Sequence, residues 1–241
     1  MNHWVQGPNR QRQPGALDVD KHTIRNTLIE TRDSLDPSFV SLSSHIICGR
    51  LLDLPELRDA VIGSYLAVGH EVNLEHLHQR LWEAPRACFV PRILSNTEME
   101  WARIESSEDL TVGTYGIPTS LRDETAELDD LDVLIMPCTG FDRMLNRLGM
   151  GGGYYDRALS KSTQSPVKIG VAFSQQEWPE IPVDRWDQPF DLVVTECELS
   201  AGNGAVSTVT TRIKPPISIN ILIGSRRPIA PKSDQYGRDR I

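Results

Sequence analysis

A glycine-rich segment at residues 149–153 constrains the fold of this chain more than any other stretch. Four glycines occupy these five positions, between an apolar run of strand length at residues 131–137 and a helix-compatible run at residues 155–161. Glycine permits positive φ angles and lets the backbone approach a ligand closely. Backbone amides at the start of the following helix favour an anion, and phosphate is the usual one. The segment therefore predicts either a phosphate-binding loop or a tight strand-to-helix turn.

Neither of two common nucleotide-binding fingerprints fits this loop. Walker A requires Gly-Lys-Ser/Thr at the end of the glycines, and no such sequence follows here. In a GxGxxG motif the last glycine would fall where Tyr154 stands. Arg147, Arg157 and Asp156 flank the glycines, and these charged side chains favour a phosphate site with a metal over a simple turn. Such a loop would need further cations from elsewhere in the chain.

Charge and composition indicate one acidic domain with two extensions. The chain has 241 residues and a formal net charge of −8, which argues against a general nucleic-acid-binding protein. Residues 201–241 nevertheless hold seven of the 25 basic residues and only two of the 33 acidic ones. We therefore predict a domain at residues 18–196 and a basic, flexible C-terminal extension at residues 197–241. Residues 1–17 show no hydrophobic period and are predicted to be a disordered N-terminal extension.

The spacing of the cysteines and the hydropathy pattern indicate the cellular compartment of the protein. The four cysteines, Cys48, Cys88, Cys138 and Cys197, are far apart and form no CxxC pair. This spacing favours a reducing compartment over a disulfide framework or a zinc site. No segment approaches the roughly 18 apolar residues of a membrane span, and the N-terminus lacks the apolar core of a signal peptide. We therefore predict a soluble, cytoplasmic protein without a nucleic-acid or membrane partner. The pattern indicates no particular oligomeric state.

Strand-like and helix-like segments alternate along the predicted domain. Asp20 and the pair Asp36-Pro37 have the character of helix N-termini. Strands are predicted at residues 61–68, 87–90, 99–104, 167–173 and 191–195. A further short strand is predicted at residues 217–223. This alternation is typical of a layered α/β domain with a mostly parallel sheet.

Several charged residues are candidates for a ligand site. In parallel sheets, ligands bind beyond the carboxyl ends of the strands. Glu71 and the glycine loop both follow predicted strands, so we expect both to line one crevice. Lys21 and Arg25 are four residues apart, and form either a two-cation phosphate grip or a solvated basic face. His70, His76 and His78 have no metal-binding spacing and are predicted to be surface or cap residues. 

Several short motifs lie in a fixed order within about residues 20–196. The longest surrounds the glycine loop and comprises residues 140–142, 146–149 and 151–157. The others are Lys21-His22-Thr23-Ile24-Arg25, Tyr65 with Glu71-Val72, Met99-Glu100-Trp101 with Ile104, and Tyr115-Gly116-Ile117-Pro118, followed by Trp186-Asp187, Asp191 and Thr195 near the end. Together these motifs resemble those of the 5-formyltetrahydrofolate cyclo-ligase family, also called methenyltetrahydrofolate synthetases.

The resemblance implies both a fold and a reaction. The fold would be an α/β three-layer sandwich with a mostly parallel sheet, in a single domain. The reaction would be the ATP- and Mg²⁺-dependent cyclisation of 5-formyltetrahydrofolate to 5,10-methenyltetrahydrofolate, with release of ADP and phosphate. In the family chemistry the formyl oxygen attacks the γ-phosphate, N10 attacks the phosphorylated imidate, and phosphate leaves. In such a phosphoryl transfer the protein mainly positions the reactants and stabilises charge.

The resemblance also implies roles for individual residues. Arg147 and Asp156 match catalytic positions. The residues that match the ATP site are Lys21, Arg25, Arg147, Gly149, Gly151, Gly152, Gly153, Tyr154, Tyr155 and Asp156. Those that match the folate site are Leu66, Glu71, Tyr115, Gly151, Gly152 and Tyr155. Asp156 and Asp191 match magnesium ligands, with Asp187 as a neighbouring alternative to Asp191.

Two other functions remain open at this point. One is a non-catalytic nucleotide- or folate-binding protein of the same fold. The other is a phosphotransferase that acts on a different small acceptor. Tyr154 and Tyr155 have a structural alternative as well, since both could pack the helix onto the sheet. Finally, we expect truncation after Glu196 to leave activity largely intact, because residues 197–241 match nothing in the family.

Overall fold

The structure is a computed structural model that describes residues 19–84 and 86–202. The N-terminal extension predicted at residues 1–17 and the strand predicted at residues 217–223 lie outside these residues. So does most of the predicted C-terminal extension, of which only residues 197–202 are described.

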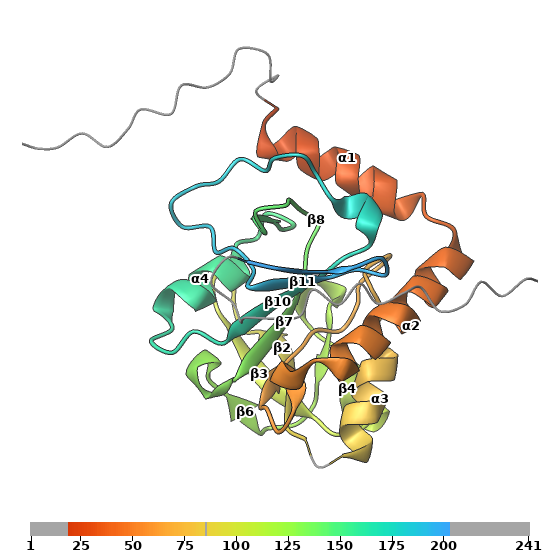
Figure 1. Cartoon of the computed structure of the whole chain (residues 1–241). Helices are drawn as coiled ribbons and strands as arrows, with labels where there is room; N and C mark the ends of the chain where they lie inside the picture. The colour runs from red at the N-terminus through yellow and green to blue at the C-terminus, as the bar shows by residue number, and fades with distance from the viewer. Residues whose placement is uncertain (1–18, 85, 203–241) are drawn as a thin grey trace, which may run out of the picture. The chain divides into compact units, whose positions relative to one another are not determined.

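An eight-stranded sheet forms the centre of the fold (Figure 1). Its strands, in spatial order, are β12 (Leu199–Ala201), β11 (Leu192–Val194), β10 (Val167–Val171), β7 (Val133–Pro137), β1 (Ile62–Gly63), β2 (Cys88–Ile93), β3 (Met99–Ile104) and β6 (Thr125–Ala126). The strands from β11 to β2 all pair in parallel. The pairs that involve β12, β3 and β6 are antiparallel. The predicted mostly parallel sheet is therefore confirmed.

The predicted strands differ from the observed ones mainly at β1. The strand expected at residues 61–68 pairs only over Ile62–Gly63. The chain then leaves the ladder, and the Tyr65 hydroxyl donates to the Val72 carbonyl at 2.7 Å. A run of apolar residues cannot distinguish a strand from a buried segment that continues past the sheet. This early exit is what brings Tyr65 and Leu66 to the carboxyl end of the sheet.

Four α-helices within residues 19–84 and 86–202 surround the sheet. They are α1 (Lys21–Asp33), α2 (Pro37–Asp53), α3 (Glu75–Glu83) and α4 (Tyr154–Lys161). The Asp20 carboxylate caps α1 by accepting from the Thr23 amide at 2.7 Å, and Asp36 caps α2 by accepting from the Ser38 amide at 2.8 Å. Both acceptors satisfy amides that a helix start leaves unpaired. Short 3₁₀ helices also lie in the described part of the chain: η1 (Pro55–Leu57), η2 (Ser107–Asp109), η3 (Thr114–Gly116), η4 (Leu128–Asp130) and η5 (Ser174–Gln176).

The side-chain alternation of the strands produces three layers. Along β7, Val133 and Ile135 belong to the core cluster that includes residues of α2 and α3. Leu134 and Met136 belong to the opposite cluster, which includes Leu159 of α4. Successive residues of a strand point to opposite faces, so both faces of this strand are buried. Figure 1 shows α2 and α3 on one side of the sheet and α4 on the other. The predicted three-layer α/β fold is confirmed.

Helix α1 is held at the edge of this core by a small cluster of its own. Ile24 and Leu28 pack with Leu148 and Ile181, and all four are buried. Leu148 belongs to β9 (Arg147–Leu148), which pairs with β8 (Gly140–Phe141) in a separate two-stranded sheet. The apolar contacts of α1 therefore place its first turn beside the segment that leads into the glycine loop.

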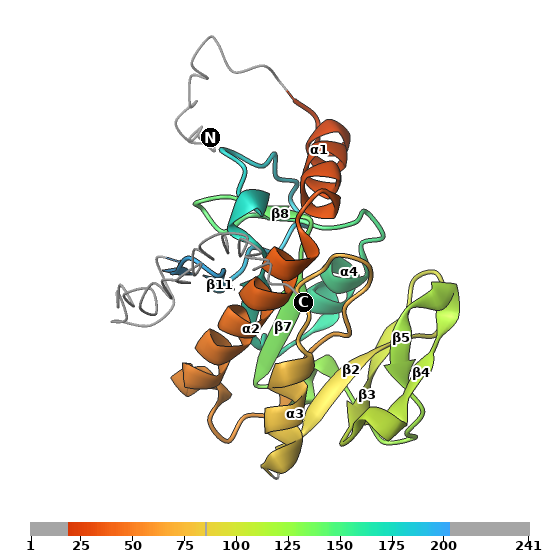
Figure 2. The same cartoon turned by 90° about the vertical axis from the view of Figure 1, so that its right-hand side faces the viewer.

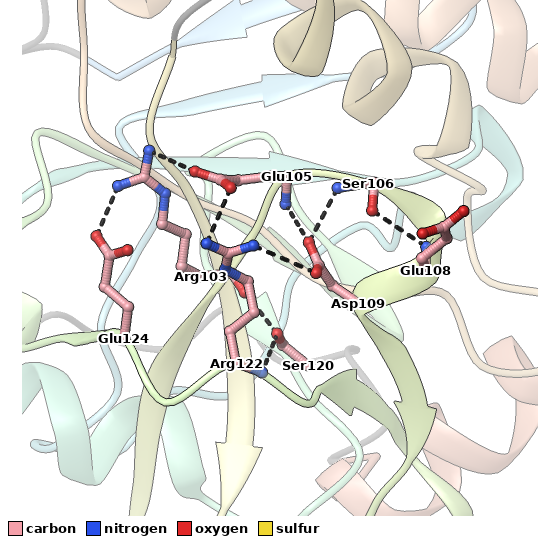
Figure 3. Close-up of polar contacts among 8 residues, drawn as sticks. All are labelled: Arg103, Glu105, Ser106, Glu108, Asp109, Ser120, Arg122 and Glu124. Carbon is pink, nitrogen blue, oxygen red and sulfur yellow. Dashed lines mark hydrogen bonds and ion pairs between the residues drawn. The ribbon is translucent and has the colours of Figure 1, made fainter.

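A second two-stranded sheet, β4 (Leu110–Val112) with β5 (Pro118–Ser120), lies next to β3 (Figure 2). A polar network fixes this region (Figure 3). Arg103 pairs with Glu105 at 2.9 Å and Glu124 at 2.6 Å, while Arg122 pairs with Glu105 at 2.9 Å and Asp109 at 3.4 Å. Partly exposed ion pairs are individually worth little, but a network orders the loops that it joins. We interpret this cluster as structural.

Candidate functional site

A pocket opens beyond the carboxyl ends of β1 and β7. Its volume is about 590 Å³, within the usual range for a small-molecule site. Tyr65 and Leu66 line it just after β1, and Cys138 and Thr139 just after β7. The glycine loop, the first turns of α1 and α4, and parts of β2 and β3 complete the lining. The crevice expected at the carboxyl edge of the sheet is present, and Glu71 and the glycine loop both line it.

The glycine loop has the backbone geometry that its composition predicts. Gly151 has a φ of 98° and Gly153 a φ of 66°, both in the region that only glycine adopts readily. Gly153 is the N-cap of α4 and contributes no capping side chain. A Cβ atom at Gly153 would lie 2.9 Å from the Arg157 guanidinium. The start of α4 therefore borders the pocket with no capping side chain, and the Arg157 guanidinium lies next to it.

The turn between β8 and β9 is built around a buried carboxylate. Asp142 is 1% exposed and accepts hydrogen bonds of 2.9 Å from the Met144 and Asn146 amides, the Asn146 side chain and the Ile181 amide. A carboxylate with this many donors is fully satisfied in place. Asp142 is absent from the pocket lining. Its effect on the site is indirect, because it fixes the strand that carries Arg147.

Four cations line the pocket: Lys21, Arg25, Arg147 and Arg157. Arg25 donates through Nε to the Gly149 carbonyl at 2.8 Å, which ties α1 to the glycine loop. Arg157 donates to the carbonyls of Asn96 and Thr97 at 3.3 Å. These two contacts hold guanidinium groups at the rim of the loop.

The other two cations form ion pairs inside the pocket. Lys21 pairs with Asp184 at 2.7 Å and with Asp187, and Arg147 pairs with Asp156. Partial burial lowers the pKa of Lys21, but hydrogen bonds to Asp184 and Asp187 outweigh it and hold that pKa above its ordinary value. Each of these carboxylates lines the pocket. The site therefore holds a balanced set of positive and negative side chains.

Apolar side chains also line the pocket. Leu66, Ile93, Met99 and Ile117 line it together with Tyr155, whose ring is partly buried against the core. Burial raises the pKa of the Tyr155 hydroxyl, which stays neutral at ordinary pH. These side chains suit the body of an aromatic or heterocyclic ligand better than a phosphate.

The structure brings most of the predicted site residues together. Among the residues expected for ATP or folate, all line the pocket except Tyr115. Tyr115 is 67% exposed, has a φ of 61°, and hydrogen-bonds through its hydroxyl to the Asn96 side chain. Asp191 is also outside the lining: its carboxylate accepts from the Lys168 amide at 2.8 Å and lies 3.1 Å from the Lys168 ammonium. Asp187 and Asp156, in contrast, both line the pocket.

Some lining residues were missed by the sequence reasoning. Asp184 and Cys138 had no assigned role, and neither did the apolar side chains of β2 and β3 such as Ile93 and Met99. Local patterns hold no signal for these residues, because the tertiary fold brings the β2–β3 hairpin to the glycine loop.

The histidines also need a correction. His78 is 2% exposed and its Nε2 lies 2.8 Å from the Ser64 hydroxyl, so it is a core residue and not a surface or cap residue.

The carboxylates bear on metal binding. No group of three or more His, Cys, Asp or Glu residues in the described part of the chain is arranged to hold a metal ion. Mg²⁺, however, is usually held by one or two carboxylates together with substrate phosphates and water. Asp156 and Asp187 are carboxylates that line the same pocket as Lys21 and Arg147. The residues present therefore fit a magnesium ion that arrives with a phosphate ligand.

The fold and the pocket together define a class of protein: an α/β protein with a pocket at the carboxyl edge of its sheet that is lined by both charged and apolar side chains. Comparisons with known proteins narrow this class. The sequence model of the 5-formyltetrahydrofolate cyclo-ligase family matches residues 18–196. The chain therefore belongs to the 5-formyltetrahydrofolate cyclo-ligase family, a family of enzymes, and the resemblance inferred from the motifs is confirmed.

Individual relatives agree with this assignment. The chain is 29% identical to the 5-formyltetrahydrofolate cyclo-ligase of Haemophilus influenzae over 181 residues, which cover 72% of this chain and 97% of the relative. It is 32% identical to the mouse enzyme over 147 residues, 56% of this chain and 72% of the relative. The solved structure of the 5,10-methenyltetrahydrofolate synthetase of Aquifex aeolicus matches with a TM-score of 0.69 and 28% identity, covering 80% of this chain and 98% of that one.

Proposed function

We propose that this enzyme converts 5-formyltetrahydrofolate and ATP into 5,10-methenyltetrahydrofolate, ADP and phosphate. The observation that carries the proposal is the lining of the pocket, in which the glycine loop and four cations occur together with apolar side chains and Glu71. The glycines and cations suit a triphosphate, and the apolar side chains suit a reduced pterin ring. The names of the relatives support the folate substrate.

The proposed reaction needs binding and charge stabilisation from the protein. The formyl oxygen attacks the γ-phosphorus, the bond to ADP breaks, and N10 attacks the resulting imidate carbon. The C–O bond to phosphate then breaks and N10 loses its proton. Lys21, Arg25 and Arg147 would neutralise charge on the transferred phosphoryl group. Since the substrate supplies both nucleophiles, no protein nucleophile is required.

Asp156 and Asp187 are the proposed holders of Mg²⁺. When bound, this ion would supply charge neutralisation at the phosphate oxygens. The sequence prediction paired Asp156 with Asp191, but Asp187 shares the pocket with Asp156 and Asp191 does not line it. Arg147 and Lys21 now pair with Asp156 and Asp187, so both cations would turn toward phosphate once these carboxylates hold a metal.

Near-ultraviolet absorbance tests the proposal, because the methenyl product absorbs there and the formyl substrate does not. The purified chain with 5-formyltetrahydrofolate, ATP and Mg²⁺ should develop this band, and omission of any one component should abolish it. A folded protein that binds ATP without turnover would instead be a non-catalytic binding protein. A phosphorylated acceptor that persists without cyclising would identify a phosphotransferase.

The compartment is part of the proposal. All four cysteines are free thiols, which supports the cytoplasmic location proposed from the sequence. A relative from Arabidopsis thaliana bears the description mitochondrial, so the two locations are competing outcomes. No helix in residues 19–84 and 86–202 is long and apolar enough to cross a membrane. Fluorescence microscopy of the tagged full chain decides between cytoplasm and organelle.

A further inference from the structure

A buried arginine lies behind the pocket at the end of α1. Arg32 is 6% exposed and does not line the pocket. Its Nε is buried and has no hydrogen-bond partner among the described residues. Arginine is almost never this buried unless it is paired. We therefore expect the Arg32 guanidinium to have a charged partner.

Two carboxylates lie near the Arg32 guanidinium. Nη1 is 3.9 Å from Glu71 Oε1, and Nε is 3.8 Å from Asp33 Oδ1. The Asp33 side chain is 52% exposed and its Oδ1 is also 3.5 Å from His70 Nδ1, so solvent and a second partner weaken its hold on Arg32. The Glu71 side chain is 14% exposed. Attraction between charges is stronger where water is excluded, so Glu71 is the more strongly coupled partner.

The two oxygens of Glu71 have different environments. Oε2 accepts a hydrogen bond of 3.0 Å from the Val68 amide, which fixes the side chain over the turn that follows β1. Oε1 has no hydrogen-bond donor among the described residues and faces Arg32 across 3.9 Å. Glu71 also lines the pocket. One edge of this carboxylate is thus anchored and the other is next to a cation.

The remaining titratable groups near Glu71 give it no positive charge. Tyr65 after β1, Cys138 after β7 and Tyr155 of α4 all lie close to it, and burial raises the pKa of each, so all three are neutral at ordinary pH. Arg147 is engaged with Asp156. Burial raises the pKa of Glu71, whereas the Val68 amide and the Arg32 charge lower it. In the described part of the chain, Arg32 is the one cation within ion-pair distance of Glu71.

We propose that Arg32 is a positioning residue that keeps Glu71 ionised and held in the wall of the pocket, an inference that rests on the proposed function for the identity of the ligand. An ionised carboxylate only accepts hydrogen bonds, and can accept two from neighbouring N–H groups. The ligand edge that Glu71 recognises is therefore one with adjacent N–H donors, as on an amino-substituted heterocycle. A protonated Glu71 would offer a donor where that ligand also has one.

Direct titration of Glu71 tests the proposal without any ligand. The carboxyl carbon of Glu71, assigned in ¹³C-glutamate-labelled protein by its loss in Glu71→Gln, is followed by NMR from about pH 4 to pH 9. Arg32→Met should raise the midpoint by about one pH unit or more, because an opposite charge at this distance lowers a carboxyl pKa by that amount. Arg32→Lys should stay near the wild-type midpoint. Arg80→Met, an exposed arginine of α3, is the matched control.

A calorimetric titration links this result to the ligand. Near neutral pH, Arg32→Met should weaken binding of 5-formyltetrahydrofolate by about tenfold, with recovery as the pH rises past the new Glu71 midpoint and with unchanged affinity for ATP. Equal Glu71 midpoints in wild type and Arg32→Met overturn the inference. If wild type binds no 5-formyltetrahydrofolate, the proposed function fails while the NMR titration still decides the role of Arg32.

A double-mutant cycle covers the case in which Arg32→Met is too unstable to titrate. Urea unfolding of Arg32→Met, Glu71→Gln and the double variant measures the coupling between the two residues. The double variant should lose less stability than the two single variants lose in sum. This follows because removal of either partner leaves the other as a buried, unpaired charge. Additive losses would contradict a coupled pair and overturn the proposal.

Discussion

The buried environment of His78 makes the free energy of unfolding depend on pH. Its ring is buried between the Ser64 hydroxyl and Trp82, with ring centroids of His78 and Trp82 6.1 Å apart. Burial lowers the pKa of His78 from 6.5 to about 4. The unfolded chain therefore binds a proton in a pH range where the folded chain does not.

We predict that the free energy of unfolding falls as the pH drops from about 6.5 toward 4. The sign follows because the unfolded state binds more protons over this window, and the full shift corresponds to about 3 kcal/mol. Urea midpoints measured at intervals from pH 7 to pH 4.5 check it. His78→Gln, which does not titrate, should show a smaller loss over the same window. An equal slope in both proteins would mean that other groups cause the dependence.

The pocket carboxylates provide a second test at the scale of single residues. Asp156→Asn and Asp187→Asn should each lower turnover by roughly a hundredfold with the fold retained, because each removes a charge proposed to hold the metal. Asp191→Asn is the matched comparison, since its carboxylate contacts Lys168 outside the pocket. It should lose about 1 kcal/mol of stability and little activity. Loss of turnover in Asp156→Asn and Asp191→Asn, but not in Asp187→Asn, would support the pairing first predicted from the sequence.

Among the elements, α1 shows how packing sets the position of charges. A Cβ atom at Gly140 of β8 would lie 2.3 Å from Leu28 Cδ1, so this glycine lets α1 approach closely. The Lys21 and Arg25 side chains belong to the same helix and line the pocket. Any displacement of α1 from β8 therefore also displaces two of the pocket cations.

We predict that Gly140→Ala costs about 1–3 kcal/mol of stability and raises the KM for ATP more than it lowers kcat. The added methyl group pushes Leu28 and α1 outward, which weakens ground-state contacts to phosphate. Gly49→Ala in α2 is the control: nothing lies within 4 Å of its Cβ position, and it should stabilise the helix by about 0.5–1 kcal/mol. Urea unfolding and steady-state kinetics measure both effects.

The elements also show what the sequence could and could not predict. Strand β3 has the bounds expected at residues 99–104, and the Asp20 and Asp36 caps lie where their side chains indicated, since these signals are local. The positive φ angles in the glycine loop follow equally from its glycine content. The partners of Lys21 were not predictable, because Asp184 and Asp187 are more than 160 positions away in the chain. Arg32 had no sequence signal either, because its importance comes from burial.

For the whole molecule, the end of the domain lies further along the chain than expected. The predicted domain ends at residue 196, as does the match to the family, but β12 extends the sheet to residue 201. The Glu198 carboxylate, just before β12, accepts from Arg143 at 2.6 Å. The Glu198 carbonyl accepts from the Thr195 amide at 2.9 Å, and the Glu198 amide donates to the Thr195 hydroxyl at 3.0 Å. These contacts make residues 197–202 part of the folded domain.

We therefore predict different outcomes for two truncations. A chain that ends at Gly202 should keep wild-type stability and activity. A chain that ends at Glu196 should lose roughly 1–3 kcal/mol, because it leaves β11 as an unpaired edge and removes several hydrogen bonds. Thermal unfolding with the absorbance assay compares them. Equal stability of the two truncated chains would show that β12 adds nothing. The absorbance assay on the chain that ends at Glu196 separately tests the first expectation, that activity stays largely intact.

The paired charges of the pocket have a consequence for selectivity. Four basic and four acidic side chains line it, and Lys21 and Arg147 are already matched with carboxylates. A bare anion must compete with those carboxylates for the same cations, and a bare divalent cation must compete with the cations for the same carboxylates. An anion that enters together with a divalent cation gives every displaced group a new partner. We therefore expect the pocket to favour a phosphate ligand that carries a divalent cation over either ion alone.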